Sequence, residues 1–333
     1  MHTLIQTGVS RIMYIAILFL SFSESVGLSD KKMQSPKIIT SVAPYVTIAN
    51  ALQAIGLAHE DGFSGIELDE DHLHCLVQVK PSCLNLIHEY STDKHMINFL
   101  HKTLFRPSID SENQAERRQA VDFTLKTLDY MEAAGISRMI LHSFSDLPGF
   151  FKSRSESANK VGYFLGCYVV QVYGILAPPL KEYRKARKDK VERSFMNSLS
   201  EIAKYASDKK IDGRPIEIVF EEHYSDAIDY DSISYGKGNF INVIRGIDTA
   251  HQLIRTGKNT DLSEMSEPIH FHAVDTNGMI DDHRTIGRGK VNFKDSLSDT
   301  IKRKLTNTIV IENRTRGSAL ESKEVLASLI KKM

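Results

Sequence analysis

Four segments in the second half of the chain place carboxylate and imidazole side chains directly after short apolar runs. The segments are FEEH at 220–223, IDTAH at 247–251, HFHAVD at 270–275 and IEN at 311–313. Ionised carboxylates are costly to bury unless a cation accompanies them. A divalent cation bound by all four segments would therefore explain why each of them carries such side chains. Mixed carboxylate and imidazole ligands suit Mn²⁺, Zn²⁺, Co²⁺ or Mg²⁺, and the sequence does not choose among these metals.

Each of these residues, taken singly, also has a structural interpretation. Asp248 fits the N-cap of a helix that starts near Ala250, and one of the pair His270 and His272 fits a satisfied core histidine. The two histidines have the same parity in a strand, so they face the same side. The joint occurrence of such residues at the ends of four successive apolar runs favours the metal site.

The elements that would position these residues alternate between strand and helix patterns. Helical patterns cover 48–58, 116–134 and 191–206. Eight strands are predicted, at 38–43, 66–68, 84–88, 139–142, 216–220, 243–247, 269–274 and 308–311. Strands alternating with helices indicate parallel βαβ units, and eight units predict an α/β fold, a single (β/α)8 TIM barrel. The active site of such a barrel lies at the C-terminal ends of its strands, where the four segments would converge.

Residues 147–190 break this rhythm and are interpreted as a helical insertion after the fourth strand. The segment contains Pro178-Pro179 and a charge run from Lys181 to Lys190. A lid or a subunit contact in a homo-oligomer would be its functional use. A packed helix hairpin with a solvated basic face is the favoured interpretation, because charge runs on helices are usually solvated.

The composition describes an ordinary globular protein of 333 residues. Lys plus Arg and Asp plus Glu are both 42, which gives a formal net charge of zero. This balance excludes a strong sequence-wide basic field, so nucleic acid is a less favoured partner than a small molecule. Three cysteines cannot all pair, which argues against a disulfide framework.

An apolar run of 11 residues at 12–22 follows Arg11 near the N-terminus. It is too short to span a bilayer as a helix, but it fits the apolar core of a secretory signal, which would make the protein exported. The alternatives are a buried element or a start at Met33, and the protein would then be cytoplasmic. Residues 1–33 are therefore treated as a leader and 34–333 as the barrel.

Five motifs together resemble the xylose isomerase-like TIM-barrel superfamily, which joins sugar isomerases and epimerases to endonucleases of the AP endonuclease family 2 type. The resemblance is best over 193–330. Its motifs are FEEH at 220–223, IDTAH at 247–251, HFHAVD at 270–275, DDHRTIGRGKVNF at 281–293 and IVIEN at 309–313. In the N-terminal half, GFSGIEL at 62–68 and AAGISRMILHS at 133–143 are the best matches.

The resemblance implies a divalent metal held by four side chains, namely Glu221, Asp248, His272 and Glu312. In the isomerase and epimerase branch the two glutamates also act as an acid/base pair on opposite faces of a sugar carbon. The metal would polarise a carbonyl, and the carboxylates would move the proton.

Further residues follow from the same resemblance. His251 would bind substrate hydroxyls or a second metal. Asp281 and His283 lie in the loop that closes over substrate, and Gly287 and Gly289 would give that loop its tight turns.

Two residues depart from the common pattern of the family. Glu222 stands where a neutral residue is common, so the fifth strand offers two carboxylates and Glu221 could be the wrong one of the two. Arg288 replaces a common acidic residue, which suggests a partner for an anionic substrate group.

Three functions remain in competition. The first is a metal-dependent isomerase or epimerase acting on a sugar, sugar phosphate or polyol. The second is a zinc-dependent phosphodiesterase on damaged DNA, which uses a larger set of ligands: Glu221, Asp248, His251, His272, Asp281, His283 and Glu312, with His88 and His142 from the third and fourth strands. The third is a non-catalytic sugar-binding barrel, which would not need both Glu221 and Glu312.

Overall fold

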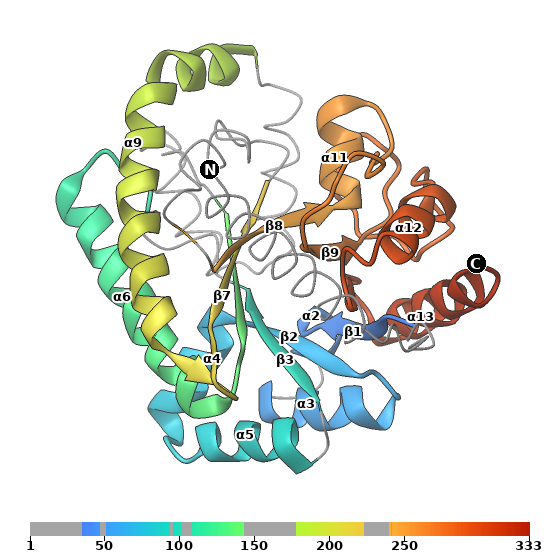
Figure 1. The fold of residues 1–333 in the computed structure, drawn as a ribbon, viewed down its shortest axis with the longest axis horizontal. Helices are drawn as coiled ribbons and strands as arrows, with labels where there is room; N and C mark the ends of the chain where they lie inside the picture. The colour runs from blue at the N-terminus through green and yellow to red at the C-terminus, as the bar shows by residue number, and fades with distance from the viewer. Residues whose placement is uncertain are drawn as a thin grey trace, which may run out of the picture. The chain divides into compact units, whose positions relative to one another are not determined.

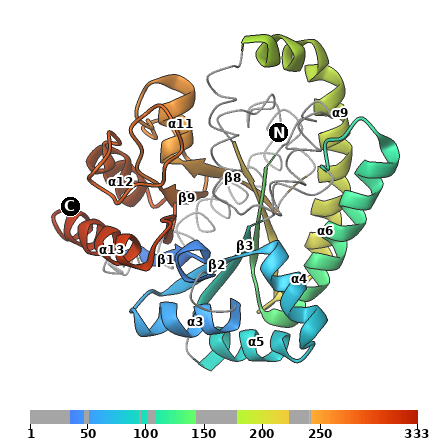
Figure 2. The ribbon, with the colours of Figure 1, turned by 180° about the vertical axis from the view of Figure 1, so that it is seen from behind.

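Eight parallel strands close into a barrel, in the order β1-β10-β9-β8-β7-β4-β3-β2 (Figures 1 and 2). They are β1 (Lys37–Ser41), β2 (Gly65–Asp69), β3 (Ile97–His101), β4 (Arg138–Leu141), β7 (Glu217–Glu221), β8 (Val243–Asp248), β9 (Ile269–Ala273) and β10 (Thr308–Ile311). The computed structural model describes residues 35–46, 51–93, 96–101, 108–142, 178–222, 240 and 242–333. The predicted (β/α)8 barrel is confirmed.

Helices surround the barrel on its outside (Figures 1 and 2). They are α2 (Ala43–Val46), α3 (Ala51–Glu60), α4 (Glu70–Val79), α5 (Cys83–Asp93), α6 (Gln114–Ala134), α9 (Pro178–Asp208), α11 (Thr249–Thr256), α12 (Phe293–Lys302) and α13 (Arg316–Lys331). A short hairpin of β5 (Lys210–Ile211) and β6 (Arg214–Pro215) follows α9.

The helix α6 illustrates how local sequence sets these boundaries. The Asn113 side chain accepts hydrogen bonds from the backbone N–H groups of Ala115 and Glu116, which caps the first turn. Gly135 ends the helix in the left-handed conformation at φ 70°. The predicted helix at 116–134 is therefore confirmed, with two more residues at its start.

The third predicted strand, at 84–88, is wrong. These residues lie in α5, and the third strand of the barrel is Ile97–His101. The apolar residues of Leu84-Asn85-Leu86-Ile87 alternate over too short a run to separate strand from helix. In the helix, Cys83 and Ile87 share the buried face, as expected for residues four apart.

Two of the predicted segments lie wholly or partly outside the described residues. The leader at 1–33 does so entirely. The insertion at 147–190 lies outside the described residues up to residue 177. Its remainder is the first part of α9, which continues without a break to Asp208. Within the described ranges, no helix is both long and apolar enough to cross a membrane.

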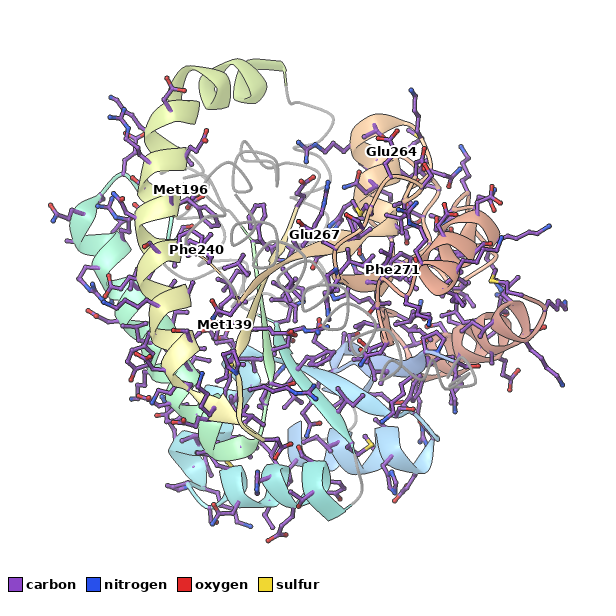
Figure 3. All side chains as sticks on the ribbon, viewed as in Figure 1. Met139, Met196, Phe240, Glu264, Glu267 and Phe271 are labelled. Carbon is purple, nitrogen blue, oxygen red and sulfur yellow. The ribbon has the colours of Figure 1, made fainter. Side chains whose placement is uncertain are left out.

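The barrel separates two apolar layers. The larger core cluster lies between the sheet and the helices and includes Met139 and Phe271, which Figure 3 labels. A smaller cluster fills the barrel interior with one side chain from each of five strands: Ile39, Phe99, Ile140, Val219 and Val310. Because side chains alternate along a strand, the residue two positions after each of these inner residues also faces inward, at the C-terminal mouth.

Gly246 makes room for one of these mouth residues. It pairs with Glu221 across β7 and β8. A Cβ atom on Gly246 would lie 2.8 Å from Glu221 Cβ and 2.9 Å from Glu221 Cα. These contacts are shorter than carbon atoms tolerate, so the glycine allows the strands to approach where Glu221 turns inward.

Substituting Gly246→Ala should therefore destabilise the protein by about 1–3 kcal/mol, as overpacking of a core does. The measurement is the free energy of unfolding from chemical denaturation. Gly317→Ala is the matched control, because no atom lies within 4 Å of its added Cβ on α13. Equal stability of the two variants would contradict this account of Gly246.

Candidate metal centre

Seven strands bring an ionisable side chain to the C-terminal mouth of the barrel. In strand order from β2 these are Glu67, His101, His142, Glu221, Asp248, His272 and Glu312, with His142 and Glu312 directly after their strands. Six of the seven are buried and His101 is partly buried. The convergence expected from the strand ends is therefore present.

The four side chains implied as metal ligands meet around His272. Its Nδ1 atom lies 3.1 Å from Glu221 Oε2 and 3.4 Å from Glu312 Oε1. Glu221, Asp248 and His272 each offer a ligand atom, and these atoms lie within 4.8 Å of one another. Both Glu221 oxygens, Asp248 Oδ2 and His272 Nδ1 are buried without a well-aligned hydrogen bond. Such atoms are rare in folded proteins and costly, and this donor set fits a divalent cation.

The pKa shifts of this group also fit a site that binds positive charge. Burial alone would raise the pKa of Glu221 and Glu312, but the positive charge of His272 holds both below the ordinary value. Burial would lower the pKa of His272, yet Glu221, Glu67 and Glu312 raise it well above the ordinary value. Burial raises the pKa of Asp248 to about 7. Without a metal, protons on the imidazoles neutralise the carboxylates.

Of the two successive glutamates, Glu221 faces the mouth, where it contacts His272. The Glu222 carboxylate instead accepts a hydrogen bond of 2.7 Å from the guanidinium of Arg255 and contacts Arg245 at 3.5 Å. Successive side chains of a strand point to opposite faces, so only one of the two glutamates can face the mouth.

A second group of ligand atoms adjoins the first. The Nε2 atoms of His101 and His142 lie 2.6 Å apart. With Glu221 they form another set whose ligand atoms lie within 4.8 Å of one another. Burial lowers the pKa of His142 to about 3, so this ring is neutral and its lone pair is free of a proton and able to bind a cation. Glu221 thus belongs to both groups.

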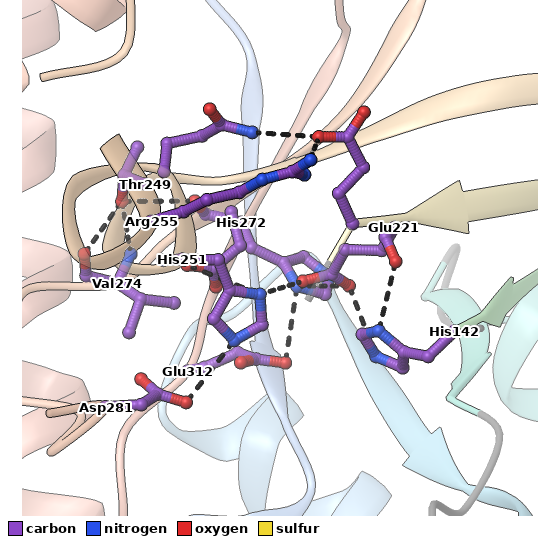
Figure 4. Close-up of polar contacts among 12 residues, drawn as sticks. His142, Glu221, Thr249, His251, Arg255, His272, Val274, Asp281 and Glu312 are labelled. Atoms are coloured by element: carbon purple, nitrogen blue, oxygen red, sulfur yellow. Dashed lines mark hydrogen bonds and ion pairs between the residues drawn. The ribbon is translucent and has the colours of Figure 1, made fainter. Parts of the chain in front are cut away.

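A third group lies on the other side of Glu221. His251 Nδ1 is 3.3 Å from Glu221 Oε1, and its Nε2 is 3.3 Å from Asp281 Oδ2 (Figure 4). His283 Nε2 lies 3.2 Å from the same oxygen of Asp281. His283 has a φ of 46°, a left-handed conformation that non-glycine residues seldom adopt and that often occurs at functional sites.

The loop that carries Asp281 and His283 is fixed by one buried carboxylate. Asp275 accepts backbone hydrogen bonds from Gly287, Gly289 and Val291. Gly287 has a φ of 86°, and a Cβ on Gly289 would collide with Asp275 Oδ1. The turns expected at these two glycines are present, for two different steric reasons.

Two of the residues expected at the site lie elsewhere. His88 is on the exposed side of α5, and its Nδ1 is the atom that a Cβ on Gly135 would meet. Its assignment depended on the misplaced third strand. Arg288 is 66% exposed and pairs with Glu321 of α13 at 2.6 Å, so it does not reach the mouth. His223 of the FEEH motif lies outside the described residues.

Sequence reasoning also missed Glu67 and His101. His101 ends the apolar run Ile97–Leu100, and this signal would have sufficed had that run been taken as the third strand. Glu67 stands in the GFSGIEL motif, but the sequence around a carboxylate in an apolar strand does not show which residues it contacts.

Comparison with known proteins places the chain in a family. A family model described as xylose isomerase-like TIM barrel matches residues 55–332. The chain belongs to this family. A 41% identical match over 58 residues to the uncharacterised protein MJ1311 of Methanocaldococcus jannaschii covers 17% of the chain and 20% of that protein.

Solved structures with the same fold include proteins named as sugar epimerases. A D-tagatose 3-epimerase-like protein has a TM-score of 0.64 at 18% identity, over 89% of this chain and 97% of that one. The protein IolI with a bound zinc atom has 0.63 at 13%, over 89% and 98%. A D-psicose 3-epimerase crystallised with D-fructose has 0.59 at 16%, over 86% and 89%.

The pKa shifts predict that the stability of the metal-free protein depends on pH. Burial would lower the pKa of His283, but Asp281 next to it raises the pKa from 6.5 to about 9. The folded state therefore holds a proton that the unfolded state releases between these values. The stabilisation is complete below about pH 6.5 and is lost as the pH rises through 9. His101, His251 and His272 shift in the same direction.

We therefore expect the melting temperature of the metal-free chain to fall between pH 6.5 and 9. The measurement is thermal unfolding in the presence of a chelator, with His283→Asn as a variant that should flatten the slope. A melting temperature that stays level or rises across this window would contradict the assignment.

Proposed function

We propose that the chain is a divalent-metal-dependent isomerase or epimerase of a sugar, sugar phosphate or related polyol. The observation that carries this proposal is the pair Glu221 and Glu312, whose carboxylates both contact His272 Nδ1, at 3.1 and 3.4 Å. Two ionised carboxylates that meet at one imidazole could take a proton from a sugar carbon and return one to it. The names of the structural neighbours, several of them sugar epimerases, support the same class.

The cation and the two glutamates would have different roles in the reaction. A cation bound by Glu221, Asp248, His272 and Glu312 would polarise a substrate carbonyl and so lower the barrier to deprotonation of the neighbouring carbon. Both glutamates have lowered pKa values despite their burial, so each is ionised and able to accept that proton. One glutamate would remove the proton and the other would return one to the opposite face.

Histidines beside the glutamates would supply and receive these protons. His251 Nδ1 lies 3.3 Å from Glu221 Oε1, and His283 Nδ1 lies 3.8 Å from Glu312 Oε2. The opposing carboxylates raise the pKa of both imidazoles against the effect of burial. His251 is therefore the closer proton donor to its glutamate, because His283 Nδ1 contacts the backbone oxygen of Glu312 at 3.3 Å and would need a small movement or a bridging water to reach the carboxylate.

This proposal predicts exchange of a carbon-bound hydrogen with solvent. With Mn²⁺ or Co²⁺ in ²H₂O, the wild-type protein should incorporate deuterium into at least one member of a panel of ketoses, aldoses and their phosphates. Glu221→Gln and Glu312→Gln should each lower the rate by about 10²–10⁴-fold, the usual contribution of an acid/base group.

The control is Glu222→Gln, which changes a buried carboxylate next in sequence that is engaged with Arg255 instead of the mouth. It should retain most of the exchange activity. Absence of deuterium from every member of the panel with the wild-type protein would count against the proposal.

A second function, that of a zinc-dependent phosphodiesterase on damaged DNA, is favoured by a separate observation. Two groups of ligand atoms share Glu221: one has His101 and His142, and the other has Asp248 and His272. Beside them, His251 and His283 both contact Asp281 Oδ2, at 3.3 and 3.2 Å. His101 takes the place that His88 had in the sequence-based set. Adjacent cations can stabilise both the attacking and the leaving oxygen in phosphate chemistry.

The number of bound metal ions separates the two functions. The isomerase requires one tightly bound cation per chain, measured by elemental mass spectrometry on protein equilibrated with Zn²⁺. Three cations per chain, with one lost in His101→Asn and one in His283→Asn, would favour the phosphodiesterase. Cleavage of a duplex oligonucleotide containing an abasic site would then be the confirming assay.

A further inference from the structure

Glu67 on β2 is a buried carboxylate shared by three imidazoles. Its Oε1 lies 3.0 Å from His101 Nδ1, and its Oε2 lies 3.1 Å from His270 Nε2 and 3.2 Å from His272 Nε2. The side chain has no exposed surface. Neither the proposed acid/base pair nor the proposed metal ligands include it, so its burial needs another explanation.

The hydrogen positions in this cluster follow from Arg138. Its guanidinium can only donate, and it lies 3.2 Å from His270 Nδ1. His270 Nδ1 must therefore accept, and the ring hydrogen lies on Nε2, where it is donated to Glu67. The guanidinium is itself held by Glu217 at 2.8 Å and lies over the ring of Phe99. His270 is thereby prevented from offering Nε2 to a cation, although Glu67, His270 and His272 lie close enough to form a ligand set.

The other two imidazoles each contact Glu67 through one ring nitrogen and face the mouth with the other. His101 contacts Glu67 through Nδ1 and faces His142 with Nε2. His272 contacts Glu67 through Nε2 and faces Glu221 and Glu312 with Nδ1. A carboxylate behind a ligating imidazole fixes which nitrogen carries the hydrogen, and so which one presents its lone pair to the metal.

We infer that Glu67 is the positioning residue of the centre. It holds the hydrogens of His101 on Nδ1 and of His272 on Nε2, so that the remaining lone pairs face the two groups of ligand atoms that share Glu221. The inference rests on the proposed function, because it assumes that a cation occupies the mouth.

The test compares Glu67→Gln with Glu70→Gln. The first substitution keeps the size of the side chain, but the amide that replaces the carboxylate could not accept from three N–H donors. Glu70 is an equally buried carboxylate three residues away, on α4, where it accepts from Thr127 Oγ1. Co²⁺ is titrated into each full-length protein by calorimetry and by visible absorption. Glu67→Gln should weaken Co²⁺ binding by about 10–100-fold and alter the visible spectrum, whereas Glu70→Gln should stay within about threefold of wild type.

Nitrogen-15 spectra of the histidine rings in the Zn²⁺-loaded wild-type protein provide a test that does not depend on a variant folding. They should show His272 bound through Nδ1 with its hydrogen on Nε2. Coordination through Nε2, or an unchanged Co²⁺ affinity and spectrum in Glu67→Gln, would overturn this inference alone. A wild-type chain that binds no Co²⁺ would instead overturn the proposed function, and the inference with it.

Discussion

The mouth of this barrel depends on the cost of burying negative charge. Glu67, Glu221, Asp248 and Glu312 are buried together, and within the described ranges no lysine or arginine forms an ion pair with any of them. Carboxylates gathered in this way repel one another and lose their hydration. Protonated imidazoles offset the charge when no cation is bound. A divalent cation bound by these side chains would offset the charge in their place and would remove the need for those protons.

The rest of the fold serves this arrangement. The closed parallel barrel brings the C-terminal ends of its strands to one place, and an apolar layer fills the interior below them. Gly246 allows β7 and β8 to approach at the level of Glu221. Asp275 fixes the loop that returns Asp281 and His283 over the opening. Each of these features has a role in positioning charge as well as in packing.

Much of this could be predicted from the sequence. The barrel followed from the alternation of strand and helix patterns, and the positions of Glu221, Asp248, His272 and Glu312 followed from strand ends and from the resemblance to the family. The mistake at 84–88 arose because a short apolar run suits a strand or a helix equally well. That mistake placed His88 at the site and hid His101. The partners of Glu67 depend on which strands become neighbours in the barrel. The left-handed conformation of His283 depends on how its loop closes. Neither feature can be predicted from the local sequence.

The central claim is that Glu221, Asp248, His272 and Glu312 bind a divalent cation together. Anomalous diffraction from a crystal soaked in Zn²⁺ tests it most directly. We predict a peak within about 2.0–2.2 Å of oxygen or nitrogen atoms of these side chains, the usual bond length for such ligands. A well-ordered mouth with the four side chains in place and no peak among them would contradict the account.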